Sequence, residues 1–293
     1  MKEILKYGDT ILPELYWKGI QAHAYIPQSD QYIRSQIKDT TVTLDLGCGP
    51  GRLYGGWSNY TGIDESREFV DYAKKTFPKA NFILGAFEDI NIEPSRFDVV
   101  FSQGVLHHVH GDTRKLWFKK IFDILKPNGK LIVGDEYIPN FRNEAERKIK
   151  LVVFYSHIIA EALNGSFEFL ATEEARNLID DVTAGGEGAG FADNELIKYI
   201  YQASQRVNSA LFEDFDLEKA NSIGKETVDY LIQRSAQLEE SAEHDNFYRG
   251  DYKVSISDNI KEIETFGLRH TDTATFGPVS KVGGMGVIVF TKK

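Results

Sequence analysis

The stretch TLDLGCGPGR, residues 43–52, constrains the fold of this chain more than any other. Val42, Leu44 and Leu46 are apolar and stand among β-favouring neighbours, which predicts a buried strand. Three alternate glycines follow at Gly47, Gly49 and Gly51. Glycine accepts positive φ and has no Cβ, so such a loop lets its backbone approach a ligand closely. The stretch therefore predicts a strand that ends in a nucleoside-binding loop.

Strand and helix patterns alternate over residues 42–138, which predicts an α/β fold with a mainly parallel sheet and helices on both faces. Ligands of such sheets bind beyond the carboxyl ends of the strands. After the first strand, further strands are expected at 60–64, 81–84, 97–102, 130–136, 268–276 and 286–291. Core helices are expected at 66–77, 113–125 and 258–266. The helix after the glycine loop should be short, because Gly55 and Gly56 interrupt it.

The regions outside this alternation predict two additional helical parts. Residues 1–40 are expected to form an N-terminal arm or lid, with breaks at Pro13 and Pro27. Residues 140–257 predict an inserted helical cap. Its expected helices span 143–163, 172–182, 193–213 and 216–241, and the core is divided into 41–139 and 258–293. Because the chain returns to the sheet after the insertion, the cap should cover the strand ends.

Composition narrows the classes of partner. The 293 residues carry a net charge of −10, which argues against nucleic acid as a partner and favours a small-molecule substrate. The chain has neither an apolar run of membrane-spanning length nor a signal-peptide pattern, so we expect a cytoplasmic protein without membrane association. The lone Cys48 excludes an internal disulfide, and the spacing of His107, His108 and His110 suits a metal ion poorly, so no metal site is predicted. The oligomeric state stays open, a homodimer included.

Two carboxylates lie where the first two expected strands end. Asp45 lies two residues before Gly47, where it can order the loop or meet a ligand ammonium group. Asp64 ends the second strand, where a carboxylate can accept both hydroxyls of a ribose. Rossmann dehydrogenases carry a similar glycine pattern, so the glycines alone leave a nicotinamide cofactor open.

Four motifs in order, TLDLGCGPGR, YTGIDES, FDVVFSQGVLHHV and LKPNGKLIVGDE, resemble the class I S-adenosylmethionine-dependent methyltransferases of the small-molecule type. The resemblance covers residues 42–138 clearly and 258–293 weakly. It implies a Rossmann-like, mainly parallel seven-stranded sheet whose last strand is antiparallel. It also implies S-adenosylmethionine as the cofactor and S-adenosylhomocysteine as its product, in preference to a nicotinamide.

The same resemblance implies roles for individual residues. The expected cofactor-binding residues are Asp45, Gly47, Cys48, Gly49, Asp64, Phe87, Glu88, Ser102 and Gln103. Phe87 would lie against adenine, while Ser102 and Gln103 would meet the methionine part. Ala86 stands where many relatives have an acid that binds the adenine amine, so Glu88 or the backbone near Phe87 would have to replace it.

The resemblance places His107 or His108 at the reaction site. His107 is the candidate base or orients the acceptor, whereas the alternative for His108 is a structural role at a helix start. The candidate acceptor-binding residues are Tyr16, Tyr25, Arg249 and Tyr252, with Lys253 beside them. The expected function is methyl transfer to O, N or C of a small molecule enclosed by core, arm and cap. Two alternatives stay open, namely another reaction of this or a modified donor, and a donor-binding regulatory protein without turnover.

Overall fold

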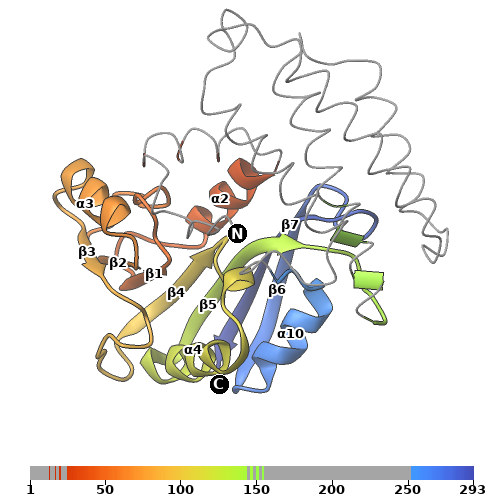
Figure 1. Cartoon of the computed structure of the whole chain (residues 1–293). Helices are drawn as coiled ribbons and strands as arrows, with labels where there is room; N and C mark the ends of the chain where they lie inside the picture. The colour runs from red at the N-terminus through yellow and green to blue at the C-terminus, as the bar shows by residue number, and fades with distance from the viewer. Residues whose placement is uncertain are drawn as a thin grey trace, which may run out of the picture.

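The computed structural model describes residues 25–143 and 252–293, together with Pro13, Trp17, Ile20, Glu146, Arg147, Lys150, Leu151 and Phe154. Its centre is a seven-stranded sheet of order β3-β2-β1-β4-β5-β7-β6 (Figure 1). The strands are β1 (Thr43–Leu46), β2 (Tyr60–Asp64), β3 (Asn81–Leu84), β4 (Phe97–Gln103), β5 (Leu125–Tyr137), β6 (Leu268–Phe276) and β7 (Gly284–Lys292). β7 runs antiparallel to β5 and β6, and the other pairs are parallel. The predicted sheet is therefore confirmed.

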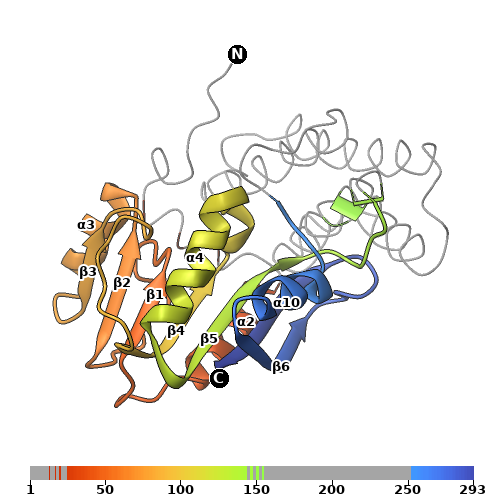
Figure 2. The ribbon, with the colours of Figure 1, turned by 90° about the horizontal axis from the view of Figure 1, so that it is seen from below.

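Helices cover both faces of the sheet (Figure 2). They are α2 (Ile26–Ser35), α3 (Arg67–Thr76), α4 (Gly111–Ile124) and α10 (Ile256–Glu264), with the 3-10 turn η1 (Leu106–His108) after β4. Ile33 of α2 and Val70 of α3 belong to one buried cluster, which also holds Phe101 of β4. Phe118 of α4 belongs to the other cluster with Val100, the neighbour of Phe101. Successive strand side chains point to opposite faces, so α2 and α3 cover one face and α4 covers the other.

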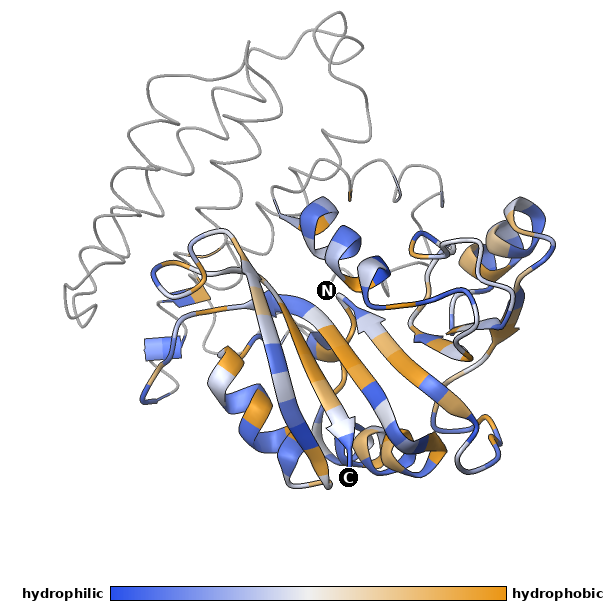
Figure 3. Cartoon of the chain, turned by 180° about the vertical axis from the view of Figure 1, so that it is seen from behind, coloured by the Kyte–Doolittle hydropathy of each residue, from blue (hydrophilic) through white to orange (hydrophobic). Residues whose placement is uncertain are grey.

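Two local features differ from or refine the expectation. Residues 47–59 form turns and bends without a helix, so the helix that was expected to be short is absent between β1 and β2. β5 begins at Leu125, earlier than the expected residue 130, because Leu125 already pairs with Phe97 of β4. A register irregularity follows this pair, and Asn128 takes a left-handed φ of 63° within it. The hydrophobic stretches of the strands lie between the two helix layers (Figure 3).

The predicted cap falls almost entirely outside the described residues, as does most of the predicted arm. In the cap region, Glu146, Arg147, Lys150, Leu151 and Phe154 are helical. In the arm, α2 begins with a proline in its first turn, as a break at that position predicts. Among the helices that the structure describes, none has the length and apolar character needed to cross a membrane.

Helix α2 is fastened to the glycine loop by a charged pair. Arg52, just after the last glycine, forms a buried ion pair with Asp30 of α2. The Arg34 guanidinium donates to the Arg52 carbonyl at 2.6 Å. A third bond joins the same helix to the sheet, since the Gln103 amide at the end of β4 donates to the Ser29 hydroxyl at 2.8 Å. The arm helix thus holds both the loop and a neighbouring strand end.

The substitution Arg52→Ala should lower the free energy of unfolding by about 3 to 5 kcal/mol, because it leaves the Asp30 carboxylate buried without its cation. Urea denaturation followed by circular dichroism measures the change. Lys115→Ala is the matched control, since Lys115 and its partner Asp112 are exposed, and it should change stability by less than about 1 kcal/mol. Equal losses in the two variants would contradict a structural role for the Asp30–Arg52 pair.

Candidate functional site

The glycine loop lies at the carboxyl end of β1 and is tied to β2 by main-chain bonds. The N–H groups of Gly47 and Cys48 both donate to the Ile63 carbonyl, at 2.9 and 3.0 Å. Gly47 and Gly49 have φ values of 68° and 53°, a region that residues with a Cβ rarely adopt. A Cβ on Gly47 would also lie 2.4 Å from a methyl carbon of Val105. The loop conformation therefore requires glycine at these positions.

Asp64 connects the end of β2 to the glycine loop. Its carboxylate accepts from the Gly49 N–H at 2.7 Å through one oxygen and from the Ser66 N–H at 2.9 Å through the other. Burial raises the pKa of Asp64, while these main-chain donors act against the rise. Each carboxylate oxygen can accept more than one hydrogen bond, so the group keeps capacity toward a hydroxyl-bearing ligand.

Asp45 faces the core beneath the loop. Its carboxylate accepts from the Tyr60 hydroxyl at 2.8 Å, and only 1% of the residue is exposed. Burial raises the pKa of Asp45 to about 7, and the negative charge of Asp64 adds to the rise while the Tyr60 bond opposes it. Cys48 is also buried, and burial raises the pKa of its thiol. These two side chains therefore order the loop from below, and Cys48 has the character of a packed residue.

The end of β4 presents two buried polar atoms. The Ser102 hydroxyl and the Gln103 carbonyl oxygen are buried, and neither has a hydrogen-bond partner among the residues that the structure describes. Gln103 lies over Gly134 of β5, where an added Cβ would collide with its side-chain oxygen. Buried polar atoms are rarely left unpaired, so this strand end has the character of a ligand-binding position.

The two side chains of the loop after β3 that were expected at adenine make contacts with α4. The Phe87 ring is 2% exposed and packs edge-on against Trp117 of α4, at 5.1 Å between ring centres. Glu88 is exposed, and its carboxylate accepts from the Trp117 indole at 2.9 Å. Lys120 donates to the carbonyls of Phe87, Glu88 and Ile90 and so fixes the loop. Both side chains expected at adenine thus contact Trp117 of α4, and the expected contact between the Phe87 ring and adenine stays a prediction.

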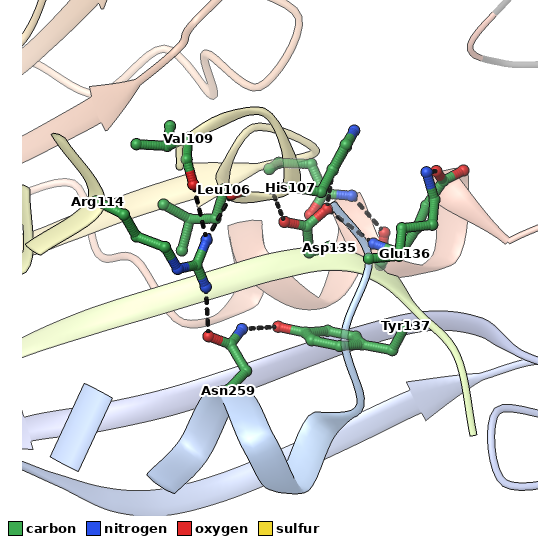
Figure 4. Close-up of polar contacts among 11 residues, drawn as sticks. Leu106, His107, Val109, Arg114, Asp135, Glu136, Tyr137 and Asn259 are labelled. Carbon is green, nitrogen blue, oxygen red and sulfur yellow. Dashed lines mark hydrogen bonds and ion pairs between the residues drawn. The ribbon is translucent and has the colours of Figure 1, made fainter. Parts of the chain in front are cut away.

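His107 lies in η1 and is held by a carboxylate at the end of β5 (Figure 4). Its Nδ1 is in close hydrogen-bond contact with one oxygen of Asp135, and its main-chain N–H donates to the other oxygen at 3.1 Å. An ionised carboxylate only accepts, so Nδ1 carries the proton and Nε2 of a neutral ring carries the lone pair. The His108 ring lies 3.9 Å from the His107 ring between centres. The structure thus adds a positioned carboxylate to the predicted histidine.

The segment that enters α10 passes directly beside His107. The Tyr252 N–H donates to the His107 carbonyl at 2.7 Å, and the Arg147 guanidinium lies over the Tyr252 ring at 4.4 Å. Lys253 is fully buried and forms an ion pair with Glu136 at 2.9 Å. Lys253, which was expected beside the acceptor-binding residues, thus has its ammonium group bonded to a carboxylate of β5.

Of the other three predicted acceptor residues, the structure describes Tyr25. The Tyr25 ring packs against Gly277 after β6, where an added Cβ would lie 2.5 Å from the ring. Tyr16 and Arg249 lie outside the described residues. Of the four residues expected at the acceptor, the structure therefore brings Tyr252 next to His107.

Known proteins that this chain resembles include methyltransferases. The family model described as a methyltransferase domain matches residues 44–133, from β1 into β5. These residues contain the glycine loop, Asp64 and His107, and they include most of the parallel strands of the sheet. Over these residues the chain is similar to the methyltransferase-domain family.

The individual relatives are distant in sequence. A sterol 24-C-methyltransferase of Clavispora lusitaniae is 28% identical over 245 residues, which cover 77% of this chain and 63% of that protein. An uncharacterized methyltransferase of Schizosaccharomyces pombe is 30% identical over 114 residues, which cover 36% of this chain and 44% of that protein. The chain thus spans less than two thirds of either relative. The methyltransferase solved with the Haloferax volcanii Trm112 activator has a TM-score of 0.51 and 12% identity, covers 94% of this chain and 92% of its own, and shares the fold.

Sequence reasoning missed several residues of the candidate site. Asp135 and Glu136 lie within the quoted LKPNGKLIVGDE motif, and their position at a strand end was a usable signal. Arg147 and Arg114 gave no such signal, because helix positions do not reveal which carbonyls or rings a guanidinium will reach. Both are buried, which polar helix residues seldom are.

The substitution Asp45→Asn should change how stability depends on pH. Asp45 titrates near 7 in the folded state and at its ordinary lower pKa when unfolded, so folding takes up a proton between these values. Its contribution to stability is therefore full at low pH and is lost as pH rises through 7, by up to about 3 kcal/mol between pH 5 and 8. Asn cannot titrate, so wild type should lose stability relative to Asp45→Asn over this interval in urea denaturation. Parallel pH curves for the two proteins would contradict the raised pKa.

Proposed function

We propose that the chain transfers a methyl group from S-adenosylmethionine to a small-molecule acceptor. The observation that carries the proposal is the bond from the Gly49 N–H to the Asp64 carboxylate at 2.7 Å, which joins a close-approach backbone loop to an acid at the next strand end. S-adenosylmethionine supplies a methyl group already activated by a positively charged sulfur. The protein then has to bind, align the acceptor and exclude water.

The described residues fit this donor on three counts. The left-handed glycines offer main-chain groups with no Cβ in the way. Asp64 keeps acceptor capacity for ribose hydroxyls beyond its two main-chain bonds. Ser102 and Gln103 each offer a buried oxygen that lacks a partner among the described residues, and a methionine ammonium group is a suitable donor for such atoms.

Adenine recognition would rest on main-chain groups of the loop after β3. The ring of Phe87 and the carboxylate of Glu88 are both engaged by Trp117. The backbone of residues 87–90 is held in place by Lys120, whose ammonium group donates to the carbonyls of Phe87, Glu88 and Ile90. Main-chain groups that are already in position would then bind adenine in place of the acid that many relatives have where this chain has Ala86.

We assign His107 as the base that takes a proton from the acceptor. Asp135 holds the ring through Nδ1 and the main chain through the N–H, which leaves the lone pair on Nε2 as the basic site of the neutral ring. The same carboxylate favours the protonated ring once the proton has been taken up. His108 lies against this ring, which supports a structural role for it.

The acceptor would bind on the β5 side of His107. Tyr252 lies there, because its main-chain N–H is bonded to the His107 carbonyl and its ring packs under the Arg147 guanidinium. Tyr252 thus provides an aromatic surface beside the base. The predicted arm and the cap of residues 140–257 would enclose this side, as such lobes do in enzymes that must exclude water. A cytoplasmic location and a small-molecule partner complete the proposal, since the charge of −10 suits neither nucleic acid nor an acidic membrane surface.

Donor binding is tested with Asp64→Ala. Wild type should gain about 2.7 kcal/mol of stability from S-adenosylhomocysteine at 100 times its dissociation constant. Asp64→Ala should bind this product about a hundredfold more weakly by calorimetry, because two charge-assisted bonds to the ribose are lost. Asp71→Ala removes the same charge from the exposed face of α3 and should bind as wild type does. If wild type binds neither the donor nor its product, the proposed function is wrong.

The role of the base is tested with His107→Gln. An acceptor is first sought by screening small molecules for formation of S-adenosylhomocysteine. His107→Gln should then lower kcat by about a hundredfold to ten-thousandfold with product affinity unchanged, because the proton of the acceptor has no base. Asp135→Asn should also lower kcat, because its amide has one acceptor oxygen in place of two for the two N–H groups of His107. The loss should be smaller than in His107→Gln, because the base itself is still present.

His270→Gln makes the same change on β6 and should leave kcat unchanged. A screen that finds donor binding but no product over a broad set of acceptors would favour the donor-binding regulatory alternative. Wild-type turnover in His107→Gln would remove His107 from the base assignment and leave the donor site in place.

A further inference from the structure

Arg114 of α4 is a buried arginine whose guanidinium reaches two other elements (Figure 4). Its Nη1 donates to the carbonyls of Leu106 and Val109, the first residue of η1 and the residue that ends it. Its Nη2 donates to the Asn259 side-chain oxygen at 3.0 Å, and its Nε donates to the Glu262 carboxylate at 2.8 Å. Asn259 and Glu262 both lie on α10. One side chain therefore links η1 to α10.

The same contact continues to the strand that carries Asp135. The Asn259 amide donates to the Tyr137 hydroxyl at 2.7 Å, and Tyr137 is fully buried two residues after Asp135 in β5. Figure 4 shows this chain of bonds from Arg114 through Asn259 to Tyr137 on one side of β5. Arg114 thus touches the backbone that carries His107 and, through Asn259, the strand that carries its carboxylate partner.

The position of η1 relative to β5 has to be held by contacts with other elements. η1 has three residues, and short 3-10 turns have poorer hydrogen-bond geometry than α-helices. His107 and Asp135 belong to different elements, so their bond holds only while η1 and β5 keep their relative position. A displacement of about 1 Å at a catalytic group can cost about a hundredfold in rate.

We propose that Arg114 is a positioning residue for His107, holding η1 so that the ring stays bonded to Asp135. The proposal rests on the proposed function, in which His107 is the base. A buried guanidinium costs free energy that a well-packed apolar side chain would not, so its presence calls for a role beyond stability. Here its N–H groups bond to a carbonyl of the 3-10 turn on one side and to the Asn259 side chain on the other. An apolar side chain could make neither bond.

The test compares Arg114→Lys and Asn259→Ala with wild type, and Lys115→Ala serves as an exposed control on the same helix. Nitrogen NMR of histidine-labelled protein, assigned with His107→Gln, reports which ring nitrogen of His107 carries the proton. Hydrogen exchange reports the His107 amide that is bonded to Asp135 and, as a reference for global opening, the Val100 amide in β4. None of these measurements requires the acceptor or the donor.

In wild type and Lys115→Ala the ring proton should reside on Nδ1. In Arg114→Lys a single ammonium group cannot serve the carbonyls of η1 and Asn259 together, so the ring should populate both tautomers. The His107 amide should exchange about tenfold faster while Val100 is unchanged. Asn259→Ala should shift the ring in the same direction, and it decides the question if Arg114→Lys does not fold.

An unchanged ring and amide at His107 in the folded variants would overturn the proposal. Equal acceleration at His107 and Val100 would also overturn it, because Arg114 would then act on overall stability alone. Calorimetry with S-adenosylhomocysteine on wild type is read separately. Failure to bind there contradicts the proposed function and leaves the positioning result at His107 standing by itself.

Discussion

Parallel pairing of β1 with both β2 and β4 sets the relative positions of the strand-end residues that are proposed to bind the donor. Leu46 pairs with Ile63 on one side and with Ser102 on the other. The next residue on each strand is therefore Gly47, Asp64 or Gln103, at the same level on three neighbouring strands. Neighbouring strands lie about 4.8 Å apart, so three side-by-side strand ends span the width of a nucleoside. The site is thus a consequence of register before it is a matter of individual side chains.

Buried charged pairs then attach separate segments to this frame. Asp30 and Arg52 join the arm helix to the glycine loop, while Glu136 and Lys253 join β5 to the segment that enters α10. A buried ion pair adds little net stability compared with apolar packing, but breaking one is costly because a lone charge stays behind. Such pairs therefore discriminate strongly against wrong docking of a segment. Both lie where a segment approaches the strand ends, which is where misplacement would damage the site most.

The sequence predicted the parts of the site that depend on local chemistry. Positive φ requires glycine, and a strand followed by glycines has few other uses, so the loop and Asp64 could be found from residues close together in the chain. Asp135 was missed although its motif was recognised, because its partner His107 is 28 residues away and lies on a different element. The resemblance implied a place for the Phe87 ring against adenine, but a pattern does not say which face of a loop turns to the core, and this ring is buried against Trp117. Contacts such as Arg114 to Glu262, 148 residues apart, follow from the packing of two helices and have no local signal.

The charge of the loop separates the two cofactor classes that share its glycine pattern. Burial raises the pKa values of Asp45 and Asp64, and the charge of Asp64 raises that of Asp45 further, so this position already resists negative charge. A dinucleotide would add a pyrophosphate, which normally relies on a helix N-terminus, and residues 47–59 have no helix there. A sulfonium and an ammonium group instead bring positive charge toward the carboxylates, which favours their ionised forms. The loop therefore favours a sulfonium donor over a dinucleotide on electrostatic grounds that glycine spacing alone does not contain.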